Sequence, residues 1–302
     1  MEQSRMSKLP SIGIIGGGFV GTAIADGFKH YTDVKLYDIS PLKTIHDYFD
    51  VVAQDILFVC LPTPMLPDGN VDLKIVRSAL HTLDSALQVT HKPVIIKSTI
   101  PPLALEQLAK DFRPNIHLIY SPEFLTERTA MLDFQQQNRL IFGDYVSDVS
   151  ATTDIVESYD KNITQINTLF SNRFPLVPTI WTTMRQASIV KYFTNVFFAT
   201  KISLMNEFAQ IAMALGEDPN GTIEMVLLDQ RIGRSHWQVP GHDGRYGFGG
   251  SCFPKDINGY MAFARELEVA PFLAMAAWEK NLEVRPDKDW EKLVGRAVSE
   301  EK

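Results

Sequence analysis

Between Ser11 and Thr183, short apolar runs alternate with stretches in which apolar residues recur at helical spacing. The first stretch reads SIGIIGGGFVGTAIADGF, which predicts a strand, a tight glycine turn and a helix. Further strands are expected at 34–38, 55–62, 93–99, 116–120 and 139–144, and within 174–183. Because strands that alternate with helices form parallel sheets, we expect a doubly wound parallel sheet with helices on both faces.

The pattern changes after Trp181. Residues 184–216 contain no proline and break only at Gly216, which predicts one helix about 45 Å long. This helix is apolar on several faces, so it needs partners in a second helical layer or another subunit. The remainder, to about Glu283, is expected to form helices around a glycine-rich loop. The charged ending RPDKDWEKLVGRAVSEEK is expected to be a surface helix or a frayed tail.

These patterns predict two domains, and 302 residues with 45% apolar side chains can bury a core in each. The first, residues 1–182, is expected to be Rossmann-like. The second, residues 183–302, is expected to be all-helical with one long central helix.

The composition argues against several classes of protein. A net charge of −7 without a long Lys/Arg run argues against a nucleic acid or an anionic membrane as partner. Cys60 and Cys252 alone cannot build a disulfide framework, and no Cys/His cluster suggests a metal. The N-terminus lacks the apolar core of a signal peptide, and no apolar stretch approaches the ~20 residues of a membrane span. We therefore expect a soluble, cytoplasmic protein.

The glycine cluster has the form of a dinucleotide site. Gly16-Gly17-Gly18-Phe19-Val20-Gly21 fits GxGxxG between a strand and a helix, where the glycines allow a tight turn, a close pyrophosphate and close helix packing. Asp38 ends the second predicted strand, where an acid accepts hydrogen bonds from the adenosine ribose. Its charge would repel a 2′-phosphate, so we expect NAD. The alternatives are a purely structural glycine turn, and a helix cap or turn at Asp38.

Two further stretches follow strands at the edge where open α/β sheets bind ligands. LPTP (61–64) and KSTIPP (97–102) place the hydroxyls of Thr63 and Thr99 there, within reach of a cofactor. Taken alone, each stretch fits a proline-terminated strand better.

The stretch GFGGSCFPKD (247–256) offers a reactive thiol. A catalytic cysteine needs neighbours that favour the thiolate, and Cys252 has glycine N–H groups before it and Lys255 after it. If the chain turns helically from Cys252, Lys255 and Asp256 point toward the side of the thiol, and Pro254 falls in the first turn, where its missing N–H costs little. The alternative is a buried, inert cysteine, which we expect Cys60 to be.

Two other pairs of polar residues are weaker indications of catalytic chemistry. Lys191 and Asn195 are spaced i, i+4 on the long helix, and together could stabilise a developing oxyanion, although Lys191 could equally extend to water along a helix edge. Glu123 and Glu127 in SPEFLTE would share a face if that stretch were helical, and such carboxylates are usually solvated.

The order of these motifs resembles that of the UDP-glucose/GDP-mannose dehydrogenase family, and most closely its UDP-glucose 6-dehydrogenases. The resemblance rests on the following stretches: GIIGGGFVG, LPTP, KSTIPP, SPEFLTE, NRLIFG, KYFTN with TKISLMNE, RIG, GFGGSCFPKD, and Asn281. It implies NAD-dependent, four-electron oxidation of a nucleotide-sugar C6 alcohol, with UDP-glucose to UDP-glucuronate as the first expectation, in polysaccharide biosynthesis.

The resemblance also implies residue roles. Cys252 would trap the aldehyde and form a thioester, Lys191 and Asn195 would stabilise oxygen charge, and Asp256 would position or activate water. Glu127 with Thr99 would transfer protons through water.

Other residues are implied in binding. Glu123, Phe124, Phe248 and Gly249 match substrate-binding positions, and Lys255 a cofactor-binding position. Arg231 matches an arginine that reaches the partner's substrate in a homodimer built on the 184–216 helix.

The chain departs from the family at three points. Family members usually continue with a third, α/β domain that closes over the uridine and sugar, where this chain ends at Lys302; the segment between Asp38 and Cys60 is short and lacks EPGL; and Arg128 replaces a glycine. Two other functions stay open: a 3-hydroxyacid dehydrogenase of the 6-phosphogluconate type, which would leave GFGGSCFPKD unexplained, and an NAD-binding dimer without turnover.

Overall fold

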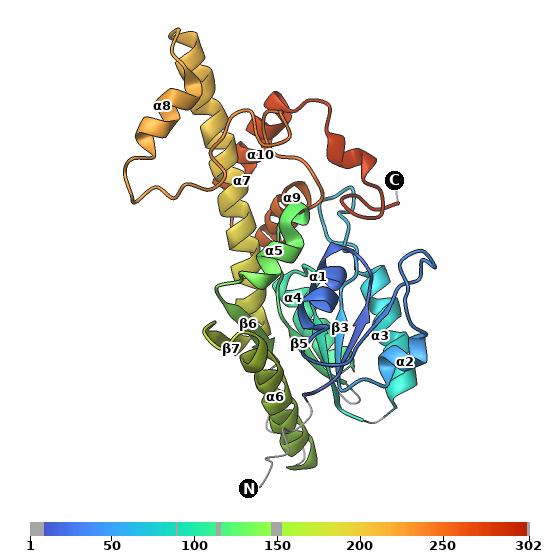
Figure 1. The fold of residues 1–302 in the computed structure, drawn as a ribbon. Coiled ribbons are helices and arrows are strands. Elements are labelled where there is room, and N and C mark those ends of the chain that lie inside the picture. Colours follow the sequence, from blue (N-terminus) through green and yellow to red (C-terminus); the bar gives the residue numbers. More distant parts are fainter. Residues whose placement is uncertain (1–8, 89, 113–115, 146–152, 301–302) are drawn as a thin grey trace, which may run out of the picture. The chain divides into compact units, whose positions relative to one another are not determined.

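A computed structural model describes residues 9–88, 90–112, 116–145 and 153–300 (Figure 1). For residues 153–156 it describes the backbone alone. The chain divides into two compact units. The first comprises Met1–Pro62 and Leu73–Lys191, and the second comprises Thr63–Asp72 and Tyr192–Lys302.

The first unit is built on a seven-stranded sheet with the strand order β2-β1-β3-β4-β5-β6-β7. The strands are β1 (Ile12–Ile15), β2 (Val34–Tyr37), β3 (Ile56–Val59), β4 (Lys92–Ile96), β5 (Ile116–Tyr120), β6 (Leu140–Asp144) and β7 (Thr179–Thr183). The helices are α1 (Phe19–Phe28), α2 (Tyr48–Val52), α3 (Lys74–Leu87), α4 (Pro102–Phe112), α5 (Ala130–Gln135) and α6 (Thr153–Arg173), with a 3-10 turn η1 (Glu127–Thr129). The strands expected from the apolar runs are therefore confirmed.

One strand pair differs from the expected parallel sheet. β5 and β6 are antiparallel, with Tyr120 opposite Gly143, whereas the other neighbouring strands are parallel. The connection from β5 to β6 contains η1 and the six-residue α5, and β6 returns in the opposite direction. The length of the helix does not impose this direction, since the five-residue α2 lies between β2 and β3, which both pair parallel to β1.

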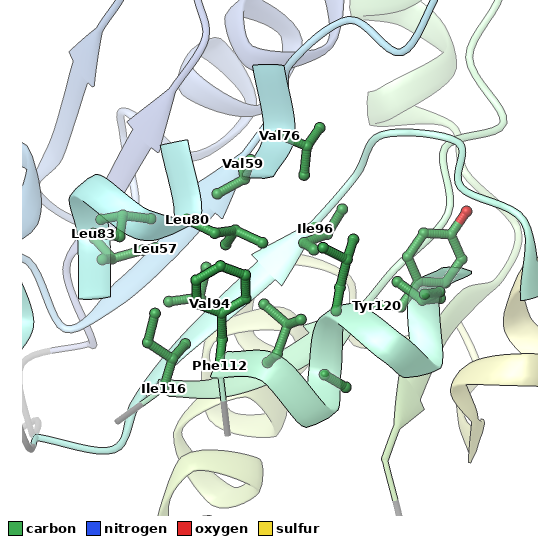
Figure 2. Close-up of a cluster of buried hydrophobic side chains, with 14 of the residues drawn as sticks. Leu57, Val59, Val76, Leu80, Leu83, Val94, Ile96, Phe112, Ile116 and Tyr120 are labelled. Atoms are coloured by element: carbon green, nitrogen blue, oxygen red, sulfur yellow. The ribbon is translucent and has the colours of Figure 1, made fainter. Parts of the chain in front are cut away.

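Side chains of each central strand alternate between the two faces of the sheet. In β3, Leu57 and Val59 pack with α2, α3 and α4, whereas Ile56 and Phe58 pack with α1, α5 and α6. Figure 2 shows the first of these clusters, in which Leu80 and Leu83 of α3 meet strand side chains. This period of two explains why the strands are apolar throughout, because both faces are covered.

The second unit is helical. It contains α7 (Met184–Ala214) from Tyr192 onward, α8 (Pro219–Val226), α9 (Cys252–Glu266), α10 (Phe272–Val284) and the 3-10 turn η2 (Asp289–Lys292). The long helix is thus confirmed, two residues shorter than expected, because Gly216 adopts a left-handed conformation with φ +80° that ends it. Within the described ranges, no helix combines the length and apolar character that a bilayer span requires.

The charged ending is neither a surface helix nor a frayed tail over its described residues. Trp290 is buried, with its ring 5.1 Å from that of Trp278, and Val298 pairs with Met65 and Val294 as isolated bridges. The expectation failed because Trp290 and Val298 are two separate apolar residues in a charged segment, and their spacing shows neither a helical nor a strand period.

Candidate active site

The glycine loop between β1 and α1 has two glycines that its own packing requires. Gly16 has φ +107°, and a Cβ built there would lie 2.3 Å from the carbonyl oxygen of Cys60. A Cβ on Gly21 would lie 1.9 Å from the carbonyl oxygen of Gly16. The first glycine therefore allows the turn and the last allows the helix to pack on it.

Gly18 has no such packing requirement. Its φ is −76°, which any residue can adopt, and a Cβ built there would meet nothing within 4 Å. It is the N-cap of α1 and makes no side-chain cap hydrogen bond, so Phe19 and Val20 begin a helix whose first N–H groups lack a side-chain acceptor. Open space at Gly18, beside N–H groups without a side-chain cap, fits the pyrophosphate of a dinucleotide.

Asp38 lies directly after β2, beside this loop. Its Oδ2 accepts a hydrogen bond of 2.7 Å from the N–H of Gly17, and its Oδ1 accepts one of 2.8 Å from the N–H of Ser40. No helix begins there, since α2 starts at Tyr48, so Asp38 is not a helix cap but does close a turn. The carboxylate is held at the edge where a ribose would lie.

The ends of β3 and β4 are tied together by a residue that the sequence did not single out. Ser98 Oγ donates a 2.6 Å hydrogen bond to the carbonyl oxygen of Leu61 and accepts one of 3.2 Å from its N–H. Thr99, next to Ser98, is half-buried in the first unit, and Thr63 is buried in the second.

The stretch SPEFLTE is not helical at Glu123. Its Oε1 accepts hydrogen bonds from the N–H groups of Phe124 and Leu125, at 2.6 and 3.0 Å, and its Oε2 lies 3.5 Å from Lys97 Nζ. Glu127 is exposed and begins η1. The two glutamates therefore do not share a helix face, because hydrogen bonds to the Glu123 carboxylate hold the backbone in a turn.

Lys191 lies within the first unit and is 6% exposed. Its Nζ is 5.8 Å from the centroid of the Phe124 ring, and the guanidinium of Arg139 is 4.1 Å from the same centroid. Lys191 is buried, so its side chain does not extend to water along the helix edge, and no carboxylate among the described residues pairs with it.

Cys252 is the first residue of α9, so the chain does turn helically after it. Ser251 is the N-cap, its Oγ lies 3.8 Å from Cys252 Sγ, and the thiol is partly exposed. Pro254 lies in the first turn, and Lys255 and Asp256 follow one turn after the cysteine. The thiol is thus at the positive, N-terminal end of a helix.

Asp256 has two partners in the second unit and is 1% exposed. The Lys255 ammonium pairs with its Oδ1, and the side-chain amide of Asn195 donates a hydrogen bond to its Oδ2. Asn195 lies one turn after Lys191 on α7, as its spacing predicts. Among the described residues, only one of the two amide N–H donors of Asn195 has an acceptor.

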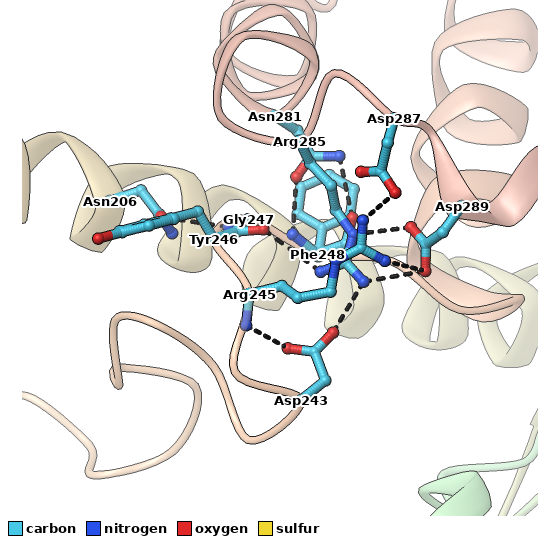
Figure 3. A network of polar contacts seen from close by, with 10 residues as sticks. All are labelled: Asn206, Asp243, Arg245, Tyr246, Gly247, Phe248, Asn281, Arg285, Asp287 and Asp289. Atoms are coloured by element: carbon cyan, nitrogen blue, oxygen red, sulfur yellow. Dashed lines mark hydrogen bonds and ion pairs between the residues drawn. The ribbon is translucent and has the colours of Figure 1, made fainter.

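The loop before Cys252 is held by side chains from α7 and α10 (Figure 3). Asn281 accepts a 2.7 Å hydrogen bond from the N–H of Phe248 and donates one of 3.0 Å to its carbonyl oxygen, while Asn206 Oδ1 accepts one of 3.1 Å from Gly247. The Phe248 side chain is buried, and Gly249 faces the guanidinium of Arg285. Of these holding residues, only Asn281 had a sequence signal.

Arg231 and Cys60 are the two remaining residues that the sequence analysis discussed. Arg231 is 89% exposed on its side chain and forms an ion pair with Asp229. Burial raises the pKa of Cys60 to about 12, so this thiol is inert at neutral pH, as expected.

Comparison with known proteins gives concordant matches. Residues 185–283 match the UDP-glucose/GDP-mannose dehydrogenase family, central domain, and residues 40–161 match that family's NAD binding domain, in agreement with NAD as cofactor. UDP-glucose 6-dehydrogenase AglM of Haloferax volcanii is 30% identical over 311 residues, which cover 89% of this chain and 69% of that protein.

A second relative, putative UDP-glucose 6-dehydrogenase YtcA of Bacillus subtilis, is 33% identical over 233 residues, or 75% of this chain and 50% of that protein. The alignment with it thus spans half of that relative. Among solved structures, a UDP-glucose dehydrogenase from Pyrobaculum islandicum is similar with a TM-score of 0.79 and 27% identity, covering 94% of this chain and 70% of that one.

Proposed function

Because this chain belongs to the UDP-glucose/GDP-mannose dehydrogenase family, we propose that it oxidises the C6 alcohol of a nucleotide sugar to a carboxylate, with two NAD⁺ per sugar. One observation carries the proposal: Cys252 is the first residue of a helix whose next turn holds the buried Lys255 and Asp256. An oxidation that stops at a ketone needs no such thiol.

The cofactor would be held by the chain's own backbone and one carboxylate. The space at Gly18 accommodates the pyrophosphate, and Asp38 would accept hydrogen bonds from the ribose hydroxyls while repelling a 2′-phosphate. When bound, NAD⁺ supplies the hydride acceptor for both oxidations.

The residues around the thiol would carry the second oxidation. The Cys252 thiolate attacks the aldehyde carbon, forming a C–S bond, and the carbonyl electrons move to an oxygen that Lys191 and the free N–H of Asn195 stabilise. Loss of hydride from that carbon leaves a thioester. Water positioned by Asp256 then cleaves the C–S bond, releasing the carboxylic acid and restoring the thiol.

The remaining roles follow the family. Glu127 with Thr99 would move protons through water, and Glu123, Phe124, Phe248 and Gly249 would line the sugar. Since the Phe248 side chain is buried and its N–H and carbonyl groups bond to Asn281, it would support the loop beside the sugar rather than donate to the sugar.

The long helix would form a homodimer. Phe193, Phe197, Leu204, Phe208 and Ile211 are all at least 37% exposed and recur at helical spacing along one face of α7. In this arrangement Arg231 would reach the partner's substrate. Light scattering of Phe197→Glu/Phe208→Glu is expected to show a monomer where the wild type is a dimer; Leu176→Glu, at an exposed site away from this helix, is the control.

The substrate is tested by NADH formation with UDP-glucose, GDP-mannose and UDP-N-acetylhexosamines, with UDP-glucose as the expected substrate because the relatives above bear that name. The wild type should form two NADH per sugar, and Cys252→Ala should not complete the second oxidation. One NADH per turnover with a 3-hydroxyacid would instead support the alternative enzyme, and NAD⁺ binding without NADH formation would support a dimer without turnover.

A further inference from the structure

Arg285, just after α10, lies against the loop that leads to Cys252. It is 3% exposed, and a Cβ built on Gly249 would lie 2.5–2.7 Å from three atoms of its guanidinium. The planar group therefore occupies the space of a side chain at Gly249. Its Nη1 also donates a 3.3 Å hydrogen bond to the carbonyl oxygen of Tyr246.

Two aspartates fix the guanidinium in this place (Figure 3). Asp289 accepts from Nε at 2.7 Å and from Nη2 at 2.9 Å, and Asp243 accepts from Nη2 at 2.7 Å. Four of the five N–H donors of the guanidinium are thus used. A lysine has three donors and no plane, so it could not reproduce this set.

Asp289 is itself anchored. The next residue, Trp290, is buried against Trp278, and Arg245 lies between the carboxylates of Asp287 and Asp289. The charged segment 285–290 thus connects the end of α10 to the loop, a role that no sequence pattern indicated.

The loop needs external support because of its glycines. Gly247 and Gly250 have φ +67° and +71°, and a Cβ on Gly250 would meet nothing within 4 Å. Glycine has the largest backbone freedom of any residue, so packing at Gly250 does not hold the chain two positions before Cys252. The loop must be held upstream, at Tyr246–Gly249.

We propose that Arg285, with Asp243 and Asp289, is a positioning residue that holds the glycine loop so that Cys252 stands ready at the start of α9. This inference rests on the proposed function for its catalytic consequence, but its structural part concerns the loop alone. Arg285 acts through Gly249 and not by contact with the thiol or the substrate.

The test compares Arg285→Lys and the milder Asp243→Asn with wild type, using Arg265→Lys, an exposed arginine of α9, as the matched control. Hydrogen exchange of the 246–252 amides, measured by mass spectrometry, should accelerate about tenfold in Arg285→Lys and less in Asp243→Asn. With the nucleotide sugar, kcat should fall about tenfold while the KM for NAD⁺ stays unchanged. The control should behave as wild type.

Three outcomes would overturn the proposal: unchanged exchange in both variants, an unchanged kcat in Arg285→Lys, or equal acceleration of exchange throughout the unit, which would mean a structural role only. If Arg285→Lys does not fold, Asp243→Asn decides. If the wild type makes no NADH with any nucleotide sugar, the proposed function fails. The hydrogen-exchange rates of the 246–252 amides still confirm or refute that Arg285 holds the glycine loop.

Discussion

The side-chain amide of Asn195 on α7 donates a hydrogen bond to the carboxylate of Asp256 on α9, and both side chains are buried. The other oxygen of Asp256 pairs with the Lys255 ammonium, also buried. Residues proposed to act on the substrate therefore also hold two helices of the second unit together. Loss of activity on substitution here must be separated from loss of stability.

The buried ion pair predicts a non-additive pair of substitutions. Asp256→Asn alone should cost about 3–5 kcal/mol in the free energy of unfolding, because it leaves the Lys255 ammonium buried without a counter-ion. Lys255→Met/Asp256→Asn should cost less than that single change, since neither charge remains. Urea unfolding measures both; equal or larger loss in the double variant would contradict the prediction. Glu283→Gln, which removes an exposed partner of Lys280, should leave the midpoint unchanged.

The two cysteines should differ in reactivity. Burial raises the pKa of Cys60 to about 12, whereas Cys252 is the first residue of α9, at the positive end of a helix. Iodoacetamide should therefore label one site per chain, Cys252, and NADH formation should be lost with it. Peptide mass spectrometry identifies the site. Cys60→Ser should label identically, and comparable labelling of Cys60 and Cys252 in the wild type would refute this assignment.

The strands of the sheet could be predicted because a strand that is buried on both faces is apolar along its whole length, and this is visible in the sequence. The residues Ile56–Val59 are apolar without interruption, and each contributes to one of two cores, so the run itself signals a central strand. The direction of β6 could not be predicted, since it depends on how α5 packs within the connection after Tyr120 and not on the composition of Leu140–Asp144.

The candidate site also contains residues that the sequence could predict and residues that it could not. Gly16, Gly21 and Cys252 stand in compact motifs whose spacing carries the geometry. Arg285 does not, because its partner Asp243 lies 42 residues away and its contact with Gly249 appears only when α10 has packed. For Glu123 and Glu127, a spacing of four left open whether the stretch was helical, because the bonds from the next two N–H groups to Glu123, which hold a turn, are not visible in the sequence.

Two glycines of the same motif should respond oppositely to alanine. Gly21→Ala should destabilise by about 1–3 kcal/mol, because its Cβ would meet the Gly16 carbonyl oxygen. Gly18→Ala should leave stability within about 0.5 kcal/mol, since its φ suits alanine and the space is open, but should weaken NAD⁺ binding about tenfold. Calorimetric unfolding and NAD⁺ titration separate the two effects. Unimpaired NAD⁺ binding by Gly18→Ala would show that the open space does not receive the cofactor.

The aspartates around Arg285 predict how stability depends on acid. Hydrogen bonds from Arg285 lower the pKa of Asp289; for Asp243, burial opposes the shift, but the bond from Arg285 leaves the pKa lowered. A carboxyl whose pKa is lower in the folded chain stabilises it above its unfolded pKa, near 3.9, and loses this contribution as pH falls through the folded pKa. Arg285→Leu should therefore lower the urea midpoint at pH 6, and the difference from wild type should shrink below about pH 4. Arg77→Leu, which removes the ion pair of the exposed Asp111 but leaves its hydrogen bond from Gln107, is the control for surface pairs and should change the midpoint less at pH 6. A deficit in Arg285→Leu that stays constant from pH 6 to pH 2.5 would show that the guanidinium contributes through packing on Gly249 rather than through its charge.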